Sequence, residues 1–326
     1  MKKYDVVALG ELLIDFTENG ISWQGNPLFE ANPGGAPCNV LAMLTKLEHK
    51  TAFIGKVGND FFGKQLKEAI EGVGIHSEYL SLDAEVHTTL AIVHTFPDGD
   101  RDFSFYRNPG ADMMLTEQEV SEALIQNSKI FHFGTLSMTQ EGVRKATKKA
   151  VQIAEESGAL ISFDPNLRPP LWKYMDEARE QILYGLEHCH ILKISDNEIQ
   201  WLTGKSDYTK GVEWINERYQ IPLILVSMGK VGSRAYYNGM MVEAASFLQK
   251  NTIETTGAGD TFCGCVLHYV LERGLENLKD NDLIEMLTFA NSAAALITTR
   301  KGALRVMPSK DEIVHNIVLS GNAVWK

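Results

Sequence analysis

The sequence predicts an α/β protein with a mainly parallel sheet, helices on both faces of that sheet, and a small β lid. From about residue 113 onward, short apolar segments alternate with longer helical segments, which is the pattern of a parallel sheet covered by helices. Residues 87–111 break this rhythm because they read as strand, turn and strand. Residues 17–33 are polar and punctuated by glycine and proline, as in an irregular or strand-built excursion. The predicted core is 1–16, 34–86 and 112–326, and the predicted lid is 17–33 and 87–111.

The composition indicates a soluble protein with a large core. The chain has 326 residues, of which 44% are apolar and 22% are charged. Its formal net charge of −11 argues against nucleic acid or an anionic membrane as a partner, although a local site can still bind an anionic substrate. No apolar run approaches the length of a membrane span, and Asp5, Glu11 and Asp15 interrupt any signal segment. We therefore expect a cytoplasmic protein whose four cysteines, which lack disulfide or zinc spacing, are reduced core thiols.

The N-terminal segments predict a strand, a glycine pair and a helix. Tyr4–Leu9 is a short apolar strand that Leu12–Phe16 continues, and Asp15 falls where the strand leaves the core. A solvated strand end is the simpler interpretation of Asp15 taken alone. The glycine pair at 34–35 opens a helix with Asn39 on its first turn, and two adjacent glycines allow the backbone to approach a polar ligand closely.

Residues 58–64, which follow a buried strand at Phe53–Val57, imitate a phosphate-binding loop. They fit the pattern G-x-x-x-x-G-K, but Gln65 stands where such a loop has Ser or Thr to bind Mg²⁺. Phe61 and Phe62 also occupy the place of the phosphate cradle. We therefore reject a P-loop at this position.

The middle of the chain predicts a hairpin and then a series of strand–helix units. The hairpin comprises residues 88–96 and 102–107 with a turn at 97–101. The strands that follow are 130–133, 160–163, 191–194 and 223–226. The helices lie near 140–157, 175–187, 196–203 and 209–218. A second hairpin joins 233–237 to 240–244 through a type I′ turn at Asn238-Gly239, and a final helix lies near 282–298.

Three polar loops indicate where a ligand binds. Ligands of an open α/β sheet bind beyond the carboxyl ends of its strands, so the loops at 164–168, 193–198 and 227–232 should converge. His188 and His190 stand two apart at a strand entry and resemble metal ligands, but alternate positions there favour packing.

The segment from Asn251 to Asp260 carries the strongest chemical signal. It leads into an apolar helix at 261–271, which Arg273-Gly274 closes. The glycines at 257 and 259 flank Ala258 at the start of this helix, where free N–H groups favour an anion. Asp260 beside them is suited to accept a proton from an attacking hydroxyl. A tight turn with an acidic first-turn residue is the alternative. An anion cradle with a base indicates phosphoryl transfer to an alcohol.

Several motifs in order along the chain resemble the ribokinase/PfkB family of carbohydrate kinases. Glu254-Thr-Thr-Gly-Ala-Gly-Asp260 is similar to the family's Asp-Thr-Thr-Gly-Ala-Gly-Asp signature, and Gly34-Gly35-x-x-x-Asn39 is similar to its N-terminal signature. Residues 105–112 and 163–172 look like the fructokinase branch. The resemblance implies a ribokinase-like fold and an ATP-dependent sugar kinase.

The resemblance also implies a role for each matching residue. Asp260 would be the base, Gly257, Ala258 and Gly259 would hold the charge on the transferred phosphate, and Arg168 would neutralise that phosphate. The sugar would be bound by Asp15, Gly34, Gly35, Asn39, Arg107 and Asn166, together with Asp260. The nucleotide would be bound by Lys193, Ser195, Ser227, Gly229, Gly232 and Asn291, together with Gly257 and Gly259. Glu198 would organise Mg²⁺, directly or through a water ligand.

Two departures from the family pattern affect these expectations. Glu254 replaces the usual Asp in a neighbourhood that holds a monovalent cation, which leaves activation by K⁺ open. Ser195 replaces the Asn of the Asn-x-x-Glu motif, whereas Glu198 is kept. Arg107 and Arg168 also have simpler interpretations, as a surface arginine and as a salt bridge at a loop.

The predicted function is an ATP-dependent fructokinase that converts D-fructose to D-fructose 6-phosphate. The same fold acting on 2-keto-3-deoxygluconate, ribose or a nucleoside is the nearest alternative, and a non-catalytic sugar or nucleotide sensor is an alternative of another class. We expect a homodimer formed through the lid, because lid strands leave edges that pair with other strands.

Overall fold

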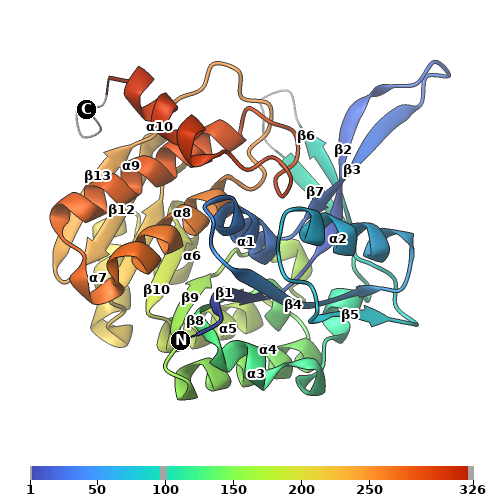
Figure 1. Ribbon diagram of the computed structural model, residues 1–326, viewed down its shortest axis with the longest axis horizontal. Coiled ribbons are helices and arrows are strands. Elements are labelled where there is room, and N and C mark those ends of the chain that lie inside the picture. Colours follow the sequence, from blue (N-terminus) through green and yellow to red (C-terminus); the bar gives the residue numbers. More distant parts are fainter. Residues whose placement is uncertain (1, 96–100, 322–326) are drawn as a thin grey trace.

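The computed structural model describes residues 2–95 and 101–321. A nine-stranded sheet runs through the centre of the molecule in the order β13-β12-β11-β10-β9-β8-β1-β4-β5 (Figure 1). Its strands are β1 (Tyr4–Leu9), β4 (Thr51–Gly58), β5 (Leu80–Asp83), β8 (Ser128–Gly134), β9 (Leu160–Asp164), β10 (Ile191–Ser195), β11 (Leu223–Ser227), β12 (Gly232–Tyr237) and β13 (Met240–Ala245). The strands from β5 to β11 are parallel, and β12 and β13 add an antiparallel edge.

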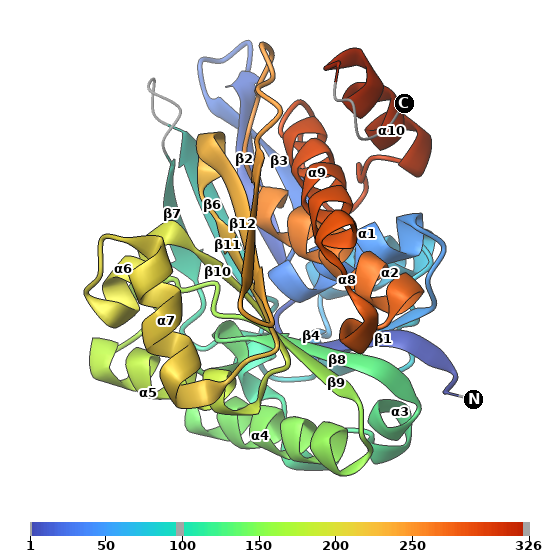
Figure 2. The same cartoon turned by 90° about the vertical axis from the view of Figure 1, so that its left-hand side faces the viewer.

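Helices cover both faces of this sheet, as Figure 2 shows. One face packs against α1 (Ala36–Lys46), α2 (Phe61–Gly72), α8 (Ala258–Arg273), α9 (Asp280–Ile297) and α10 (Lys310–Leu319). The other face packs against α3 (Glu122–Gln126), α4 (Glu141–Glu156), α5 (Met175–His188), α6 (Asp196–Thr203) and α7 (Tyr208–Tyr219). The central strands read as continuous apolar runs because both of their faces are buried. The predicted fold class is therefore confirmed.

A second, four-stranded sheet has the order β3-β2-β6-β7. It is formed by β2 (Leu13–Ile21), β3 (Pro27–Gly34), β6 (Leu90–Thr95) and β7 (Arg101–Tyr106). The β6–β7 pair is antiparallel, as the predicted hairpin requires, and the turn predicted at 97–101 falls mostly on residues 96–100, which lie outside the described residues. The ends of β2 and β3 form an arm that projects from the molecule in Figure 1.

The prediction that Leu12–Phe16 continues the first strand is wrong. β1 ends at Leu9, and β2 begins at Leu13 in the other sheet, where Ile14 pairs with Leu90. Between the two strands, Oε1 of Glu11 accepts a hydrogen bond from the backbone N–H of Ala36 at 2.8 Å, which joins this turn to the start of α1. Asp15 therefore belongs to the small sheet.

The rejected P-loop forms the start of α2. Asp60 is the N-cap of this helix, and its carboxylate accepts hydrogen bonds from the N–H groups of Gly63 and Thr88 at 2.8 Å. The turn thus binds its own carboxylate. In contrast, α10 has no counterpart in the prediction, which placed the final helix near 282–298.

All four cysteines are buried and free, as expected of core thiols. Among residues 2–95 and 101–321, we find no helix that combines the length and the apolar composition needed to span a membrane.

Candidate active site

A cleft of about 550 Å³ lies between the two sheets, at the carboxyl ends of β9 and β10. The small sheet contributes Leu13, Asp15 and Phe105 to its lining. The core contributes Glu11, Gly35, Ala36, Asn39, Leu136, Asn166, Arg168, Lys193, Ser195, Asn197, Glu198, Thr255, Thr256, Gly257, Gly259 and Asp260. Two of the three loops predicted to converge, at 164–168 and 193–198, do so here.

Asp260 and Asn39 meet in this cleft although 221 positions separate them in the sequence. Asp260 lies on the first turn of α8 and Asn39 on the first turn of α1. The side-chain amide of Asn39 donates a hydrogen bond to Oδ2 of Asp260 at 2.8 Å. Burial raises the pKa of Asp260 to about 6, against the lowering effect of this hydrogen bond. Asp260 is therefore ionised near neutral pH and can still accept a proton.

Lys193 brings a buried positive charge to the same place. Its ammonium lies 2.9 Å from the carboxylate of Asp164, and both side chains are more than nine-tenths buried. Burial alone would lower the pKa of Lys193, but the carboxylates of Asp164, Glu198 and Asp260 outweigh it and raise that pKa well above its usual value. Lys193 is a permanent cation at the edge of the cleft, suited to a phosphate oxygen.

The turn before α8 needs glycine at position 257, and a side chain at position 259 would crowd Lys193. Gly257 is the N-cap of the helix with φ of 75°, and a Cβ there would lie 2.6 Å from Cβ of Ala303. A Cβ on Gly259 would lie 3.1 Å from Nζ of Lys193. The first N–H groups of a helix have no partner within the helix, so this turn presents donors and a positive dipole end towards the cleft.

Glycines also shape the wall of the cleft beside α1. A Cβ on Gly34 would collide with Oδ2 of Asp15, and a Cβ on Gly35 would collide with the carbonyl oxygen of Glu11. Gly34 thus makes room for the Asp15 carboxylate, and Gly35 allows α1 to approach the end of β1. Asn39 is buried, and its Oδ1 has no hydrogen-bond partner among the described residues.

Ser195 and Glu198 form the capping box of α6. One Glu198 oxygen, Oε2, accepts hydrogen bonds from the N–H and the hydroxyl of Ser195, both at 2.8 Å. The other, Oε1, accepts from the N–H of Leu167 at 2.7 Å. Glu198 therefore joins the loop after β9 to the start of α6 while it lines the cleft.

Arg107 has a different environment from the one predicted. It is 7% exposed, and its guanidinium pairs with Asp112 at 2.6 Å. It also donates hydrogen bonds to Oγ1 of Thr139 at 3.0 Å and to the carbonyl of Leu136 at 2.9 Å. Arg107 does not belong to the lining set, whereas Leu136 does. The structure places Arg107 behind the wall of the cleft, as a support for that wall.

Four residues predicted to bind the nucleotide also lie outside the lining of this cleft: Ser227, Gly229, Gly232 and Asn291. Two of them, Gly232 and Asn291, contact Ala244 and Ala245, which belong to the wall of a second cavity of about 640 Å³ lined by 243–249 and by residues of α9 and α10. The amide of Asn291 donates hydrogen bonds to the carbonyls of Ala244 and Ala245 at 3.0 and 3.2 Å. A Cβ on Gly232 would collide with the carbonyl of Ala244.

Glu11 and Asp164 were missed as site residues. Glu11 lines the cleft, and burial raises its pKa to about 7. Asp164 holds Lys193. Asp164 ends β9, and Glu11 follows β1 by two residues, so their positions at the carboxyl ends of strands were a readable signal.

Comparison with known proteins gives the same picture as the geometry. The family model for pfkB family carbohydrate kinases matches residues 3–310. "Probable fructokinase-4" of Arabidopsis thaliana is 38% identical over 319 residues, which cover 97% of each chain. The chain belongs to the pfkB family of carbohydrate kinases. It is a sugar kinase, a phosphotransferase whose acceptor is a hydroxyl group.

Solved structures of pfkB-type sugar kinases superimpose on the whole chain. Fructokinase from Xylella fastidiosa with bound ATP has a TM-score of 0.88 at 26% identity and covers 99% of this chain and 100% of its own. Fructokinase from Vibrio cholerae O395, in a form that holds fructose, ADP and a calcium ion, has a TM-score of 0.86 at 27% identity, with coverages of 96% and 98%. The ribokinase-like fold is confirmed.

Proposed function

We propose that the protein is an ATP-dependent fructokinase that converts D-fructose and ATP to D-fructose 6-phosphate and ADP. The observation that carries this proposal is the Asp260 carboxylate, which lies at the N-terminus of α8 with a pKa raised to about 6. The names of the relatives at 38% identity support fructose as the acceptor.

In the proposed reaction, Asp260 accepts the proton of the sugar hydroxyl as its oxygen attacks the γ-phosphorus of ATP. The bond from that phosphorus to the β–γ bridging oxygen breaks, and ADP leaves. The N–H groups of the turn at Gly257–Gly259 and the cations of Lys193 and Arg168 stabilise the charge on the transferred phosphate. The enzyme thus supplies position and charge without a covalent intermediate.

The sugar would occupy the side of the cleft lined by Asp15, Gly35, Asn39 and Asn166. Sugars offer hydroxyl groups, which carboxylate and amide groups bind through hydrogen bonds. The unpartnered Oδ1 of Asn39 supports this assignment, since a buried acceptor without a donor is costly. The small sheet would close over the sugar as a lid and exclude water from the transfer.

The nucleotide would extend from the turn at Gly257 towards the second cavity. Asn291 and Gly232 would then act indirectly by fixing the wall at Ala244 and Ala245. Ser227 ends β11, and Gly229 begins the short helical turn that joins β11 to β12.

The oxygen atoms near the proposed position of the ATP phosphates suit a hard divalent cation such as Mg²⁺. Glu198 and Asn197 line the cleft with oxygen ligands, the type that Mg²⁺ prefers. Glu198 already accepts hydrogen bonds at both oxygens, so it would hold Mg²⁺ through a water ligand. When bound, Mg²⁺ would neutralise phosphate charge. The dependence of turnover on K⁺ remains a prediction to be tested. Glu254, which stands where the family pattern has Asp, accepts a hydrogen bond at Oε1 from the N–H of Gly302 at 2.9 Å.

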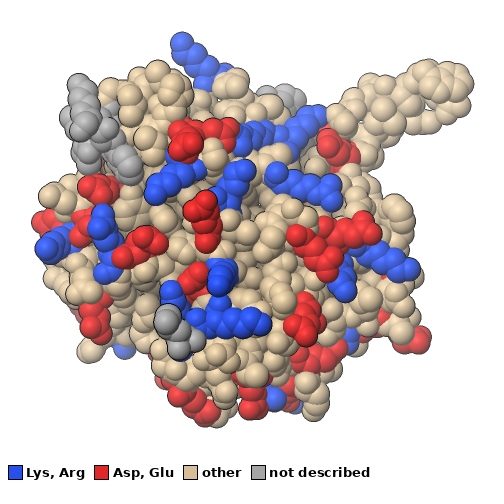
Figure 3. Space-filling model, in the orientation of Figure 1, with Lys and Arg blue, Asp and Glu red and all other residues tan. Residues whose placement is uncertain are grey.

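We also infer that the projecting arm forms a homodimer. Trp23 is 93% exposed and Ile21 is 74% exposed near the arm's tip, while Leu28 and Phe29 are exposed on its return strand. The arm is mostly uncharged in the space-filling view of Figure 3. A second copy of the same arm would bury these side chains and pair the open edge of β3.

The test is coupled ADP release with Mg-ATP against fructose, ribose, 2-keto-3-deoxygluconate, adenosine and aminoimidazole riboside, each with and without K⁺. We expect the highest turnover on fructose. The Asp260→Asn variant should lose about 10²–10⁴ in turnover and retain sugar binding. Highest turnover on another acceptor would overturn the choice of sugar, and full turnover of Asp260→Asn would overturn the assignment of the base.

A sensor that binds sugar or nucleotide without turnover is the contrasting function. The intact turn at Gly257–Gly259 with Asp260 argues against it. It would gain support only if every acceptor gave no ADP release while binding was measurable.

A further inference from the structure

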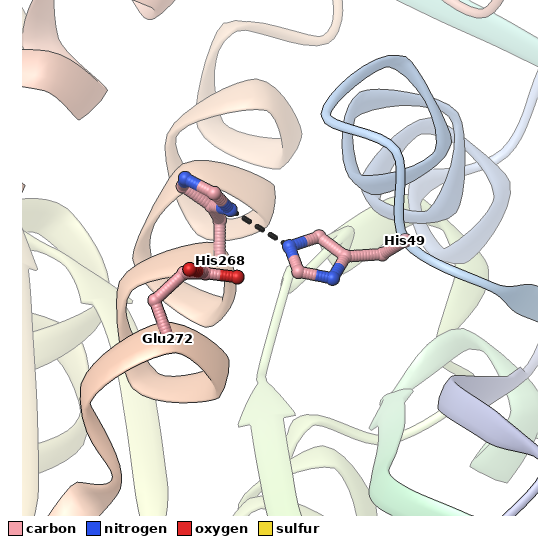
Figure 4. A group of neighbouring side chains, drawn as sticks. All are labelled: His49, His268 and Glu272. Atoms are coloured by element: carbon pink, nitrogen blue, oxygen red, sulfur yellow. Dashed lines mark hydrogen bonds between the residues drawn. The ribbon is translucent and has the colours of Figure 1, made fainter.

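A cluster of two histidines and a glutamate lies at the opposite end of α8 from Asp260. His268 and Glu272 are four positions apart on the helix, and His49 comes from the turn between α1 and β4. One ligand atom from each of the three residues lies within 4.8 Å of the other two. Figure 4 shows the two imidazole rings pointing at each other, with the Glu272 carboxylate beside them. The rise of a helix places His268 roughly 12 Å along the axis from Asp260.

We propose that His49, His268 and Glu272 bind a divalent transition metal of the zinc class. Two imidazole nitrogens and a carboxylate oxygen are a common three-ligand set for Zn²⁺, with water in the fourth position. The site is separate from the phosphate-transfer cleft, and the proposal does not depend on the proposed function.

The geometry of the histidine pair is close to what a metal requires. Nε2 of His49 and Nδ1 of His268 are 2.7 Å apart. Two nitrogens bound to one tetrahedral zinc ion are about 3.3 Å apart, so the rings need to separate by about 0.6 Å and to turn until both nitrogens point at the ion. Residues four apart on a helix lie on one face, which brings Glu272 to the same point. Since Glu272 is exposed, its side chain can adjust to the ion.

The two facing nitrogens share one hydrogen bond, so only one of them carries the proton between them. The histidine that donates must move its proton to its other ring nitrogen before both facing nitrogens can bind a metal.

A second carboxylate faces the outer nitrogen of His49. Nδ1 of His49 lies 3.7 Å from Oδ2 of Asp5. Asp5 is itself fixed, because it accepts the N–H of Lys50 at 2.9 Å and pairs with Lys129 at 2.8 Å. A carboxylate behind a histidine ligand orients the ring and strengthens its bond to the metal. At 3.7 Å the two atoms are too far apart for a hydrogen bond, and we expect this bond to form when the His49 ring moves to bind a metal.

The experiment is titration of chelator-treated, nucleotide-free protein with ZnCl₂, followed by calorimetry and by competition with a chromophoric chelator. We expect one zinc ion per chain and a rise in the midpoint of thermal unfolding with zinc concentration. His49→Gln and His268→Gln should each weaken binding at least tenfold, and Asp5→Asn by about tenfold. Cobalt in place of zinc should give the intense visible absorption of a four-coordinate site in the wild type and lose it in His268→Gln.

His188→Gln is the matched control, since it removes a half-buried histidine that pairs with Glu155 at 2.6 Å. It should leave zinc affinity unchanged. Glu272→Gln changes an exposed side chain, so it tests the site even if a histidine variant fails to fold. Equal affinity in wild type, His268→Gln and Glu272→Gln would overturn the proposal, as would no zinc binding by the wild type.

Discussion

The pKa of the Asp260 carboxylate results from opposing effects of its surroundings. Burial and the nearby Asp164 raise its pKa, whereas Asn39, Lys193 and Arg168 lower it. The balance, about 6, places a proton acceptor close to neutral pH, where general base catalysis is most effective.

The pH dependence of turnover follows from this balance. The proposed base Asp260 can accept a proton only when it is ionised, so turnover should fall as pH drops through about 6. Asn39→Ala removes a hydrogen bond that favours the ionised form, which raises the pKa of Asp260. We expect the acidic limb of the kcat profile to move up by about one pH unit. An unchanged limb in Asn39→Ala would contradict the assignment of Asp260 as the titrating group.

The buried ion pair of Arg107 leads to a prediction about the stability of the protein. Arg107→Ala leaves the carboxylate of Asp112 buried without its cation, which should cost about 3–5 kcal/mol in the free energy of unfolding. Arg273→Ala is the control, because its ion pair with Asp282 is half-exposed and should contribute less than about 1 kcal/mol. Denaturant unfolding measures both. A similar small loss in the two variants would show that the buried pair does not support the wall.

Asp260 and Arg107 also show how much of a residue's environment can be predicted from the sequence. Asp260 could be predicted because its neighbours, two glycines and a helix start, define its environment locally. Arg107 was predicted to be a sugar ligand. Its ion-pair partner Asp112 is five positions away, but Thr139 and Leu136, which also hold the guanidinium, are about 30 positions away. A pattern of residue types does not show whether a guanidinium faces a ligand or its own protein.

At the scale of elements, α1 and α8 pack closely, and this contact positions the Asn39–Asp260 pair. Gly264 lies one turn beyond Asp260 on α8, and a Cβ there would be 2.8 Å from Cβ of Met43 and 3.0 Å from the carbonyl of Val40. The missing side chain allows the two helices to approach.

Gly264→Ala should therefore separate the helices. We expect a loss of about 1–3 kcal/mol in stability, as in other overpacked cores, and a lower kcat because the Asn39–Asp260 hydrogen bond lengthens. Gly142→Ala on the exposed first turn of α4 is the control, since a Cβ there has open space and alanine should stabilise the helix by about 0.5–1 kcal/mol. Thermal unfolding and turnover of both variants provide the comparison.

Most elements were predictable because their hydrophobic periodicity and their caps are local. The helices α4 to α7 lie within about one residue of the predicted bounds. The sequence also carried a signal for α10, because Ser309 and Glu312 form a capping box, yet the prediction missed this helix. The path of β2 was not predictable from its own residues, since Leu13–Phe16 suits either sheet.

At the scale of the whole molecule, the arm of β2 and β3 is the feature that most needs a partner. Wild-type protein should sediment as a dimer. Ile21→Thr combined with Trp23→Ser should shift it to the monomer, because the two changes remove the most exposed apolar side chains of the arm. Leu319→Ser, at a residue 72% exposed on α10, should leave the dimer intact. A wild-type monomer, or a dimer unaffected by the double change, would exclude the arm as the interface.

The order of strands and helices predicted the class of the main sheet and most of its strands, because alternation restricts how parallel strands connect, but the edge strand β5 was not predicted. The projection of the arm was not predictable, because it depends on how a hairpin leaves a sheet that forms from distant segments. The cleft was predicted in part: the loops at 164–168 and 193–198 line it as expected, whereas the loop at 227–232 does not.

The Asn39–Asp260 contact has a consequence for folding during synthesis on the ribosome. Synthesis of the 221 positions between them takes roughly 10–40 seconds. During that interval the apolar face of α1, including Val40, Leu41 and Met43, has no α8 to cover it. The nascent chain therefore exposes an apolar surface that a chaperone can cover. Phosphate transfer cannot begin until α8, which carries Asp260, has been synthesised.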